Sequence, residues 1–433
     1  MCVMMTSRSL LFLCVLLGLG VMGAGAYEVR TWTNADGRTI QAELISYDGT
    51  NVTVKDTNGR RFTFAKTKLS QADLAYLKEY ANVTPSPFGD KSADAKVSNP
   101  AKQAKIDVKS FKEAGEFEIP QGKFQILETP HFKVMHTKGA KPDDLAELAE
   151  RMWLDAAFFH TGFARYFQDR RMAIFLVDDE YMYTNIGEWY AGLLEQAGGA
   201  GVDAATQVRK TWKQAAAGHV NLPASIADPN GVLPTARVFR NYVIEGTPSA
   251  DEKVKTEKIK GVWSPFRVHC LAGDLLDVQT RGLSGFGSRG YYALNTGLAY
   301  YKEINLTGKS ETSILSSESV QDAKSTGGFS GSDKWGDELR KVIRKGDLKP
   351  SLELLVNLTP QGAAPETNVL AYSFLHFLHS SQARIAGWSA LVERISTSNQ
   401  VPEVEDMAKL LGFPDAATME KEWIEYISSG KIK

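Results

Sequence analysis

Hydrophobic and polar residues alternate over four short stretches near the start of the chain, with turn signals between them. The alternating stretches are residues 27–33, 39–47, 51–55 and 61–65. The turn signals are Asp36-Gly37, Asp48-Gly49 and Asn58-Gly59, dipeptides that favour tight β-hairpin turns. The pattern predicts a meander of strands that can curl into a small barrel, followed by a helix over residues 71–80 with Ser70 as its N-cap.

A change of pattern follows this first unit. Residues 82–115 carry many Pro, Gly, Lys and Ser residues without periodicity, which predicts a solvated, flexible linker. Residues 123–137 alternate again and predict a hairpin with Pro130 at its turn. Residues 143–168 then follow a helical pattern, and residues 171–177 predict a strand.

The remainder of the chain is mainly helical by its periodicity. We expect residues 178–260 to be irregular, with short helical pieces. Residues 307–333, which are rich in Ser, Gly and Thr, should form a surface loop. Ser264 and Pro265 favour the start of a helix. The expected helices are residues 264–278, residues 291–303 and, with breaks at Pro402 and residues 412–414, residues 334–428.

The N-terminus and the charge balance limit the partners and the compartment. Arg8, the apolar run at residues 10–21 and Ala24-Gly25-Ala26 are typical of a cleaved secretory signal over residues 1–26; the alternative is an uncleaved anchor. Cleavage predicts an exported protein, periplasmic, in the cell envelope or extracellular, without an integral membrane span. It leaves one cysteine, Cys270, which we expect to be buried and inert. Because 50 Lys and Arg face 51 Asp and Glu in 433 residues, we expect no nucleic-acid partner.

Several segments of the first unit together resemble the SLA1 homology domain 1 (SHD1) family, an SH3-like barrel. The matching segments are Arg30-Thr31-Trp32-Thr33, Asp36-Gly37-Arg38-Thr39-Ile40, Ala42-Glu43-Leu44, Gly59-Arg60-Arg61-Phe62-Thr63 and Leu69-Ser70-Gln71-Ala72-Asp73. The resemblance implies a domain over residues 27–83 that binds a peptide somewhere within Tyr27 to Tyr80. The family binds Asn-Pro-Phe-x-Asp peptides, and Pro87, Phe88 and Asp90 in the linker have that spacing, so they are a candidate internal ligand.

Blocks spread over some 300 residues resemble the peptidase MA-like (gluzincin) domains, which are zinc proteases of thermolysin-like topology. The blocks are Glu128–Val134, the helix expected over residues 143–168 with the strand Ile174-Phe175-Leu176, Val268–Gly273, Ala293–Tyr301, Val369–Leu378 and Lys421–Tyr426. The resemblance implies that residues 116–433 form such a domain. It places a His-Glu-x-x-His helix at His269 and the third zinc ligand at Thr296.

The residues at those positions do not make a hydrolytic zinc site. Such a site needs three protein ligands, an open position for water and a base. His269 stands at the first ligand position, but Gly273 and Thr296 stand at the other two, and Cys270 replaces the general base. We therefore expect no catalytic residues, no metal and no cofactor.

Other residues offer few substitutes by their spacing. Asp274 lies about 100° around the helix from Gly273, so we expect it to point elsewhere. His376 and His379 have a spacing that a metal could use, but their apolar surroundings favour a core position. A Cys–His nucleophile would need a partner for Cys270 from elsewhere, and His131, His136, His160 and His219 form no ligand-spaced set.

The sequence as a whole predicts an α+β protein with two units. A small SH3-like barrel (residues 27–83) is joined by a linker (residues 84–115) to a thermolysin-like zincin domain (residues 116–433) with a helical C-terminal half. We expect an exported, non-catalytic protein- or peptide-binding protein whose partners include a second copy of itself. Its cleft would lie between residues 264–278 and 291–303. The alternatives are an active zinc metallopeptidase with non-standard ligands, and an envelope scaffold that self-associates through the barrel.

Overall fold

The computed structural model describes residues 30–47, 51–56, 60–81, 99–120, 122–160, 162–167, 169–242, 263–280, 289–320, 329 and 331–432. The expected signal and the linker motif Pro87, Phe88 and Asp90 lie outside these residues. Within them, every helix is either too short or too polar to cross a bilayer.

An antiparallel meander forms the N-terminal unit, as predicted. The sheet has the order β1 (Arg30–Thr33), β2 (Thr39–Tyr47), β3 (Asn51–Asp56) and β4 (Arg61–Ala65), and α1 (Gln71–Ala81) follows it. Trp32, Val52 and Val54 are buried between the sheet and the helix. The Ser70 hydroxyl accepts a 3.2 Å hydrogen bond from the Asp73 amide, which confirms Ser70 as the cap of α1.

A mixed six-stranded sheet forms the centre of the larger unit. Its order is β5 (Lys112–Ile119), β6 (Gly122–Glu128), β7 (Phe132–His136), β8 (Arg171–Val177), β10 (Val232–Arg240) and β9 (Ala217–Asn221). The predicted hairpin at Pro130 is the antiparallel pair β6–β7, while β7, β8 and β10 run parallel. β9 lies at the edge, antiparallel to β10.

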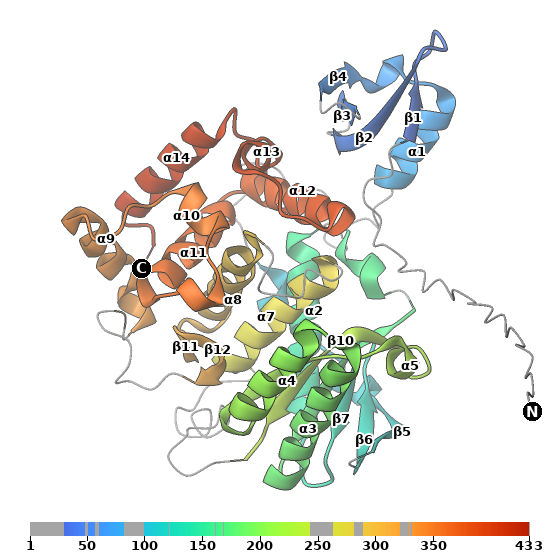
Figure 1. Ribbon diagram of the computed structural model, residues 1–433, viewed down its shortest axis with the longest axis vertical. Coiled ribbons are helices and arrows are strands. Elements are labelled where there is room, and N and C mark those ends of the chain that lie inside the picture. Colours follow the sequence, from blue (N-terminus) through green and yellow to red (C-terminus); the bar gives the residue numbers. More distant parts are fainter. Residues whose placement is uncertain are drawn as a thin grey trace, which may run out of the picture.

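Helices cover both faces of this sheet (Figure 1). Along β8, Met172, Ile174 and Leu176 join the core beneath α2 (Asp143–Phe159) and α7 (Pro265–Thr280). The alternate residues, Ala173, Phe175 and Val177, join the core beneath α3 (Glu180–Ala197). This period of two is that of a strand buried on both faces.

Three expectations for this unit are wrong. The helix predicted over residues 143–168 ends at Phe159, and a separate 3-10 turn, Phe163–Phe167, follows it. Residues 178–260, expected to be irregular with short helical pieces, contain the long helices α3 and α4 (Ala200–Thr211) and the strands β9 and β10. The short helix α5 (Ala224–Ala227) agrees with the expectation. The flexible linker is expected to extend to residue 115, but its C-terminal part packs against the larger unit. Ala101 is buried, and the carbonyls of Ala101 and Ala104 accept hydrogen bonds from Arg151 on α2.

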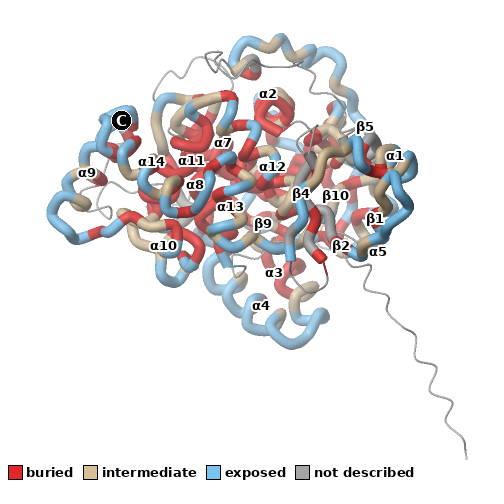
Figure 2. Tube along the Cα trace, turned by 90° about the horizontal axis from the view of Figure 1, so that it is seen from above, coloured by how far each residue is buried: buried red, intermediate tan, exposed pale blue. Residues whose placement is uncertain are grey.

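The C-terminal half is helical, as predicted. Its helices are α8 (Tyr291–Thr307), α9 (Trp335–Lys345), α10 (Leu352–Val356), α11 (Pro365–Leu378), α12 (Gln382–Ser398), α13 (Val404–Leu410) and α14 (Ala416–Ser428). The breaks at Pro402 and residues 412–414 separate the last three. α8 and α11, together with the preceding helix α7, are almost entirely buried (Figure 2).

The predicted surface loop at residues 307–333 is wrong in its first part. There, β11 (Thr312–Ser313) and β12 (Ser316–Val320) form a hairpin, and Thr312 and Ile314 are fully buried. Burial of the Ile314 side chain explains why this polar segment folds against the helices instead of remaining in solvent.

Candidate functional site

A cavity of about 350 Å³ lies where α7, α8, α3, α4 and the edge strand β9 meet. One part of its wall is apolar: Tyr190, Leu194, Ala204, Val208 and Ala299. The remainder is polar or small: His219, Asn221, Arg237, His269, Cys270, Gly273, Asp274, Asp277, Tyr291, Asn295 and Thr296. The cavity thus occupies the predicted cleft between α7 and α8, and the segment expected to be irregular supplies its other wall.

All four positions that the peptidase resemblance singled out line this one cavity: His269, Cys270, Gly273 and Thr296. The Cys270 side chain is buried, as predicted. At Gly273, a Cβ would lie 2.9 Å from Oδ1 of Asn295. The Asn295 amide fills this place and donates to the Gly273 carbonyl over 3.1 Å. A larger residue at 273 would therefore have to displace Asn295.

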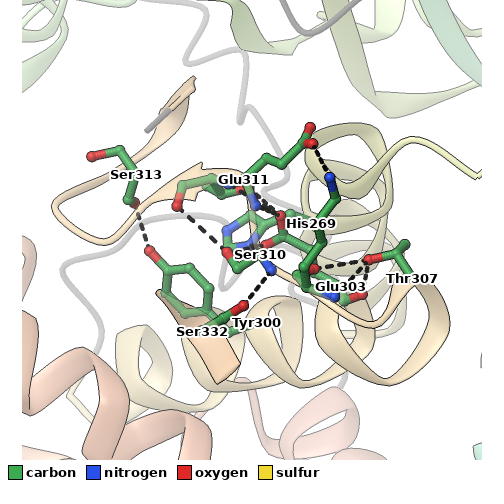
Figure 3. A network of polar contacts seen from close by, with 10 residues as sticks. His269, Tyr300, Glu303, Thr307, Ser310, Glu311, Ser313 and Ser332 are labelled. Atoms are coloured by element: carbon green, nitrogen blue, oxygen red, sulfur yellow. Dashed lines mark hydrogen bonds and ion pairs between the residues drawn. The ribbon is translucent and has the colours of Figure 1, made fainter. Parts of the chain in front are cut away.

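His269 is held by a fully buried carboxylate. Its Nδ1 donates to Oε2 of Glu303 over 3.0 Å. Glu303 also accepts hydrogen bonds from the backbone amides of Glu311 and Thr312, over 2.7 and 3.1 Å, and from the Ser310 hydroxyl over 2.9 Å (Figure 3). One carboxylate therefore fixes both the start of the β11–β12 hairpin and the His269 ring.

The Nε2 atom of His269 differs from Nδ1 because it has no hydrogen-bond partner among the described residues, although the residue is only 2 % exposed. Tyr300 packs edge-on against the ring at 4.5 Å. Because Nδ1 donates to Glu303, Nε2 is the ring nitrogen left for a further interaction. The ring lines the cavity, so this nitrogen is available to whatever the cavity holds.

A second polar cluster lies along the same cavity. Arg237 of β10 donates to both carboxylate oxygens of Asp274, from Nε over 2.8 Å and from Nη2 over 2.5 Å. His219 of β9 lies with Nδ1 3.2 Å from Oδ1 of Asp274. Asp277 accepts hydrogen bonds on Oδ1 from the Tyr291 hydroxyl and, over 3.1 Å, from Asn295.

This cluster corrects two expectations. Asp274 does not point away from the site, and His219 does belong to a set with ligand spacing: one atom each of His219, Asp274 and Asp277 lies within 4.8 Å of the others. The sequence analysis missed His219 because β9 lies in the segment expected to be irregular. The i, i+3 spacing of Asp274 and Asp277 on α7 was the available signal.

Burial and neighbouring charges separate the two carboxylates electrostatically. Burial raises the pKa of Asp277 to about 6. Burial would also raise the pKa of Asp274, but the charge and hydrogen bonds of Arg237 and His219 more than offset it and lower that pKa. Burial opposes protonation of His219, yet the Asp274 carboxylate raises the His219 pKa above its usual value. The cavity therefore holds one firmly ionised and one readily protonated carboxylate.

His376 and His379, which have metal-compatible spacing in the sequence, occupy core positions in the C-terminal half. The His376 Nδ1 lies 2.9 Å from the Tyr426 hydroxyl, and burial lowers the pKa of His376 to about 4. The His379 Nδ1 donates to the Leu375 carbonyl over 2.7 Å. Both rings pack against Tyr301.

The N-terminal unit carries a groove of its own, of about 260 Å³, within the expected peptide-binding range. The apolar side chains Trp32, Ile40, Phe62, Phe64 and Leu69 line it together with the basic residues Arg38 and Lys68. Phe62 is 37 % exposed, which is high for so large an apolar side chain. The groove combines an apolar floor with positive charge, which suits a peptide carrying an aromatic and an acidic residue.

Comparisons with family models, with curated proteins and with solved structures found no match to this chain.

Proposed function

We propose that the protein is an exported, non-catalytic binding protein that holds a polypeptide segment or a small ligand in the cavity between α7 and α8. In this proposal the N-terminal unit is an SH3-like SHD1 barrel that recognises peptides, and the larger unit is a thermolysin-like domain that has lost its zinc ligands. One observation carries the proposal: the expected catalytic positions line a single open cavity, yet Gly273, Thr296 and Cys270 occupy three of the four.

The composition of the wall supports a ligand with both apolar and polar groups. Tyr190, Leu194 and Val208 offer apolar surface on one side. The His269 ring, whose Nε2 has no hydrogen-bond partner within the described part of the chain, lies in the wall with the Asp277 carboxylate. Cavities of this volume with a few convergent polar groups are typical of small-molecule and peptide sites.

The groove on the N-terminal unit supports the second half of the proposal. A Pro-Phe-x-Asp segment would place its Phe against Phe62 and Phe64 and its Asp near Arg38 or Lys68. The linker residues Pro87, Phe88 and Asp90 offer such a segment within the chain, and a neighbouring copy offers it in trans, the arrangement that the scaffold alternative requires.

The second candidate function is a hydrolase with non-standard ligands. The cluster of His219, Asp274 and Asp277 favours it, because these residues supply metal-ligating atoms at the same cavity.

A peptide-binding assay tests the main proposal. Native mass spectrometry would measure retention of a dansylated tetrapeptide library by the full chain and by Ala204→Trp, which fills the cavity from an exposed position of α4. Thr206→Trp, exposed on the same helix but outside the cavity wall, is the matched control. We expect wild type and the control to retain peptides intact, and Ala204→Trp to lose at least tenfold in affinity. Cleaved peptides would favour the hydrolase. Equal binding by all three proteins would show that the peptides bind outside this cavity and would contradict the proposal.

A further inference from the structure

Three donor groups converge at the end of the cavity farthest along α7 from His269. The Nδ1 or Nε2 atom of His219 and one oxygen each of Asp274 and Asp277 lie within 4.8 Å of one another. The two carboxylates come from positions i and i+3 of α7, and the imidazole comes from the edge strand β9. We propose that these three residues form a binding site for one divalent transition-metal cation.

The chemistry of the three donors selects the class of ion. One imidazole nitrogen with two carboxylate oxygens suits Zn²⁺, Mn²⁺ or Fe²⁺ better than Ca²⁺ or Mg²⁺, which prefer oxygen ligands alone. Both hydrogen bonds to Asp277 end on Oδ1, so Oδ2 remains open to a cation. The cavity leaves room for water or a ligand to complete the coordination shell.

Neighbouring residues hold the donors in place, as outer-shell residues do around metals. Arg237 orients the Asp274 carboxylate through two hydrogen bonds, of 2.8 and 2.5 Å, and neutralises one of the two negative charges. Asn295 and Tyr291 orient Asp277. Bound metals in proteins depend on such second-shell hydrogen bonds, whose loss costs about 10- to 100-fold in affinity.

His269 provides an independent observation that points to a ligand in this cavity. It is 2 % exposed, it lines the same wall, and its Nε2 is unpartnered among the described residues. Eight residues at about 1.5 Å rise separate it from Asp277, about 12 Å along α7, so it lies outside the coordination shell of the proposed ion. It lines the same cavity, in which a molecule bound to the cation would lie.

The proposed site differs from the zinc site that the peptidase resemblance implies, and it does not require that the cavity binds peptides. Of its residues, only His219 and the two aspartates need to contact the ion. The resemblance would place a metal on His269 instead, so the two locations predict opposite effects for a substitution at His269 and one at Asp277.

Calorimetric titration of the chelator-treated full chain with ZnCl₂ and, separately, MnCl₂ tests the proposal. We expect one equivalent bound by wild type, at least ~100-fold weaker binding by Asp277→Asn and His219→Gln, and a change below threefold in His269→Gln. Binding of far less than one equivalent by wild type, or loss in His269→Gln with retention in the other two, would overturn it.

A second measurement keeps the test valid if a variant fails to fold. X-ray absorption of wild type loaded with one equivalent of Zn²⁺ should show nitrogen and oxygen neighbours with one imidazole and no sulfur. A sulfur ligand would assign the ion to Cys270, and two imidazoles would contradict the proposed donor set. Retention of the dansylated peptides by the metal-free chain, measured in parallel, separates failure of this site from failure of the proposed function.

Discussion

The two ends of the cavity differ in how sequence motif and metal-binding groups correspond. At the His269 end, the sequence resembles a zinc-binding helix, but Gly273 and Thr296 stand at the other two ligand positions, and Glu303 anchors His269 to the β11–β12 hairpin. At the other end no motif is visible, yet His219, Asp274 and Asp277 converge and Arg237 supports them. The same helix, α7, serves both ends.

The comparison shows that one helix, α7, carries both the positions named by the resemblance and the two aspartates of the proposed site. Residues 269, 273 and 277 share one stripe of α7, because i, i+4 and i+8 fall on the same face. The paired histidines of the peptidase motif would stand at the first two of these positions. The third, Asp277, extends the same stripe to the part of the cavity wall that β9 and β10 complete.

The largest expected effect concerns the buried ion pair at the charged end. Arg237→Met would leave the fully buried Asp274 carboxylate without its cation, and we expect it to lower the free energy of unfolding by about 3–5 kcal/mol in urea denaturation. Arg209→Met is the matched control, since Arg209 pairs with Glu195 on an exposed surface and its loss should change the free energy of unfolding far less. Equal effects of the two substitutions would show that Asp274 is not held by Arg237.

A substitution at Asp277 sharpens the comparison through its dependence on pH. Because burial raises the folded-state pKa of Asp277 to about 6 from an unfolded value near 3.8, ionisation of Asp277 lowers stability progressively between those values. In metal-free protein, Asp277→Asn should therefore raise the free energy of unfolding by about 3 kcal/mol at pH 8 and have little effect at pH 4. Zn²⁺ at pH 8 should reverse the order, stabilising wild type and not the variant.

The outcome that contradicts this account is a variant less stable than metal-free wild type at pH 8. It would mean that the hydrogen bonds from Tyr291 and Asn295 outweigh the cost of burying the charge. Glu366→Gln, a carboxylate in the first turn of α11, serves as the control, because it lies outside the cavity wall.

The smallest change in stability is expected at the His269 end of the cavity, where Gly273 lies. Gly273→Ala would bring a Cβ within 2.9 Å of Oδ1 of Asn295, a strain that outweighs the gain in helix propensity and costs about 1 kcal/mol net in thermal unfolding. Gly192→Ala on α3 is the matched control: nothing lies within 4 Å of its Cβ, so the substitution should stabilise the protein by up to about 1 kcal/mol. Stabilisation by both would show that Asn295 moves freely.

Local sequence patterns predicted much of the fold, and long-range contacts account for most of what they missed. Turn dipeptides and alternation located β2 to β4, and the Ser70 cap located the start of α1. The helix α3 was missed although Tyr183, Ile186 and Tyr190 recur at helical spacing, because Gly187 and Gly192 are typical of breaks in a helix. Gly187 has a packing role instead: a Cβ there would lie 2.5 Å from Trp212.

The candidate site was predictable only in part, for a similar reason. The sequence placed His269, Cys270, Gly273 and Thr296 around one cleft, where the structure has them. It could not join His219 to Asp274, because that pairing depends on β9 returning antiparallel to β10 at the sheet edge, some fifty residues before α7. Nor did local pattern show that Thr312 would be buried, since the carboxylate that binds its amide comes from α8.

The position of a bound ion tests the account most directly. Anomalous difference maps from crystals of the full chain grown with MnCl₂ would locate the ion without reference to any variant. We predict one peak between His219 and the carboxylates of Asp274 and Asp277, with the His269 ring free of metal. A peak on His269 would contradict the claim that His219, Asp274 and Asp277 bind the ion. So would crystals grown with saturating MnCl₂ that show no peak in the cavity.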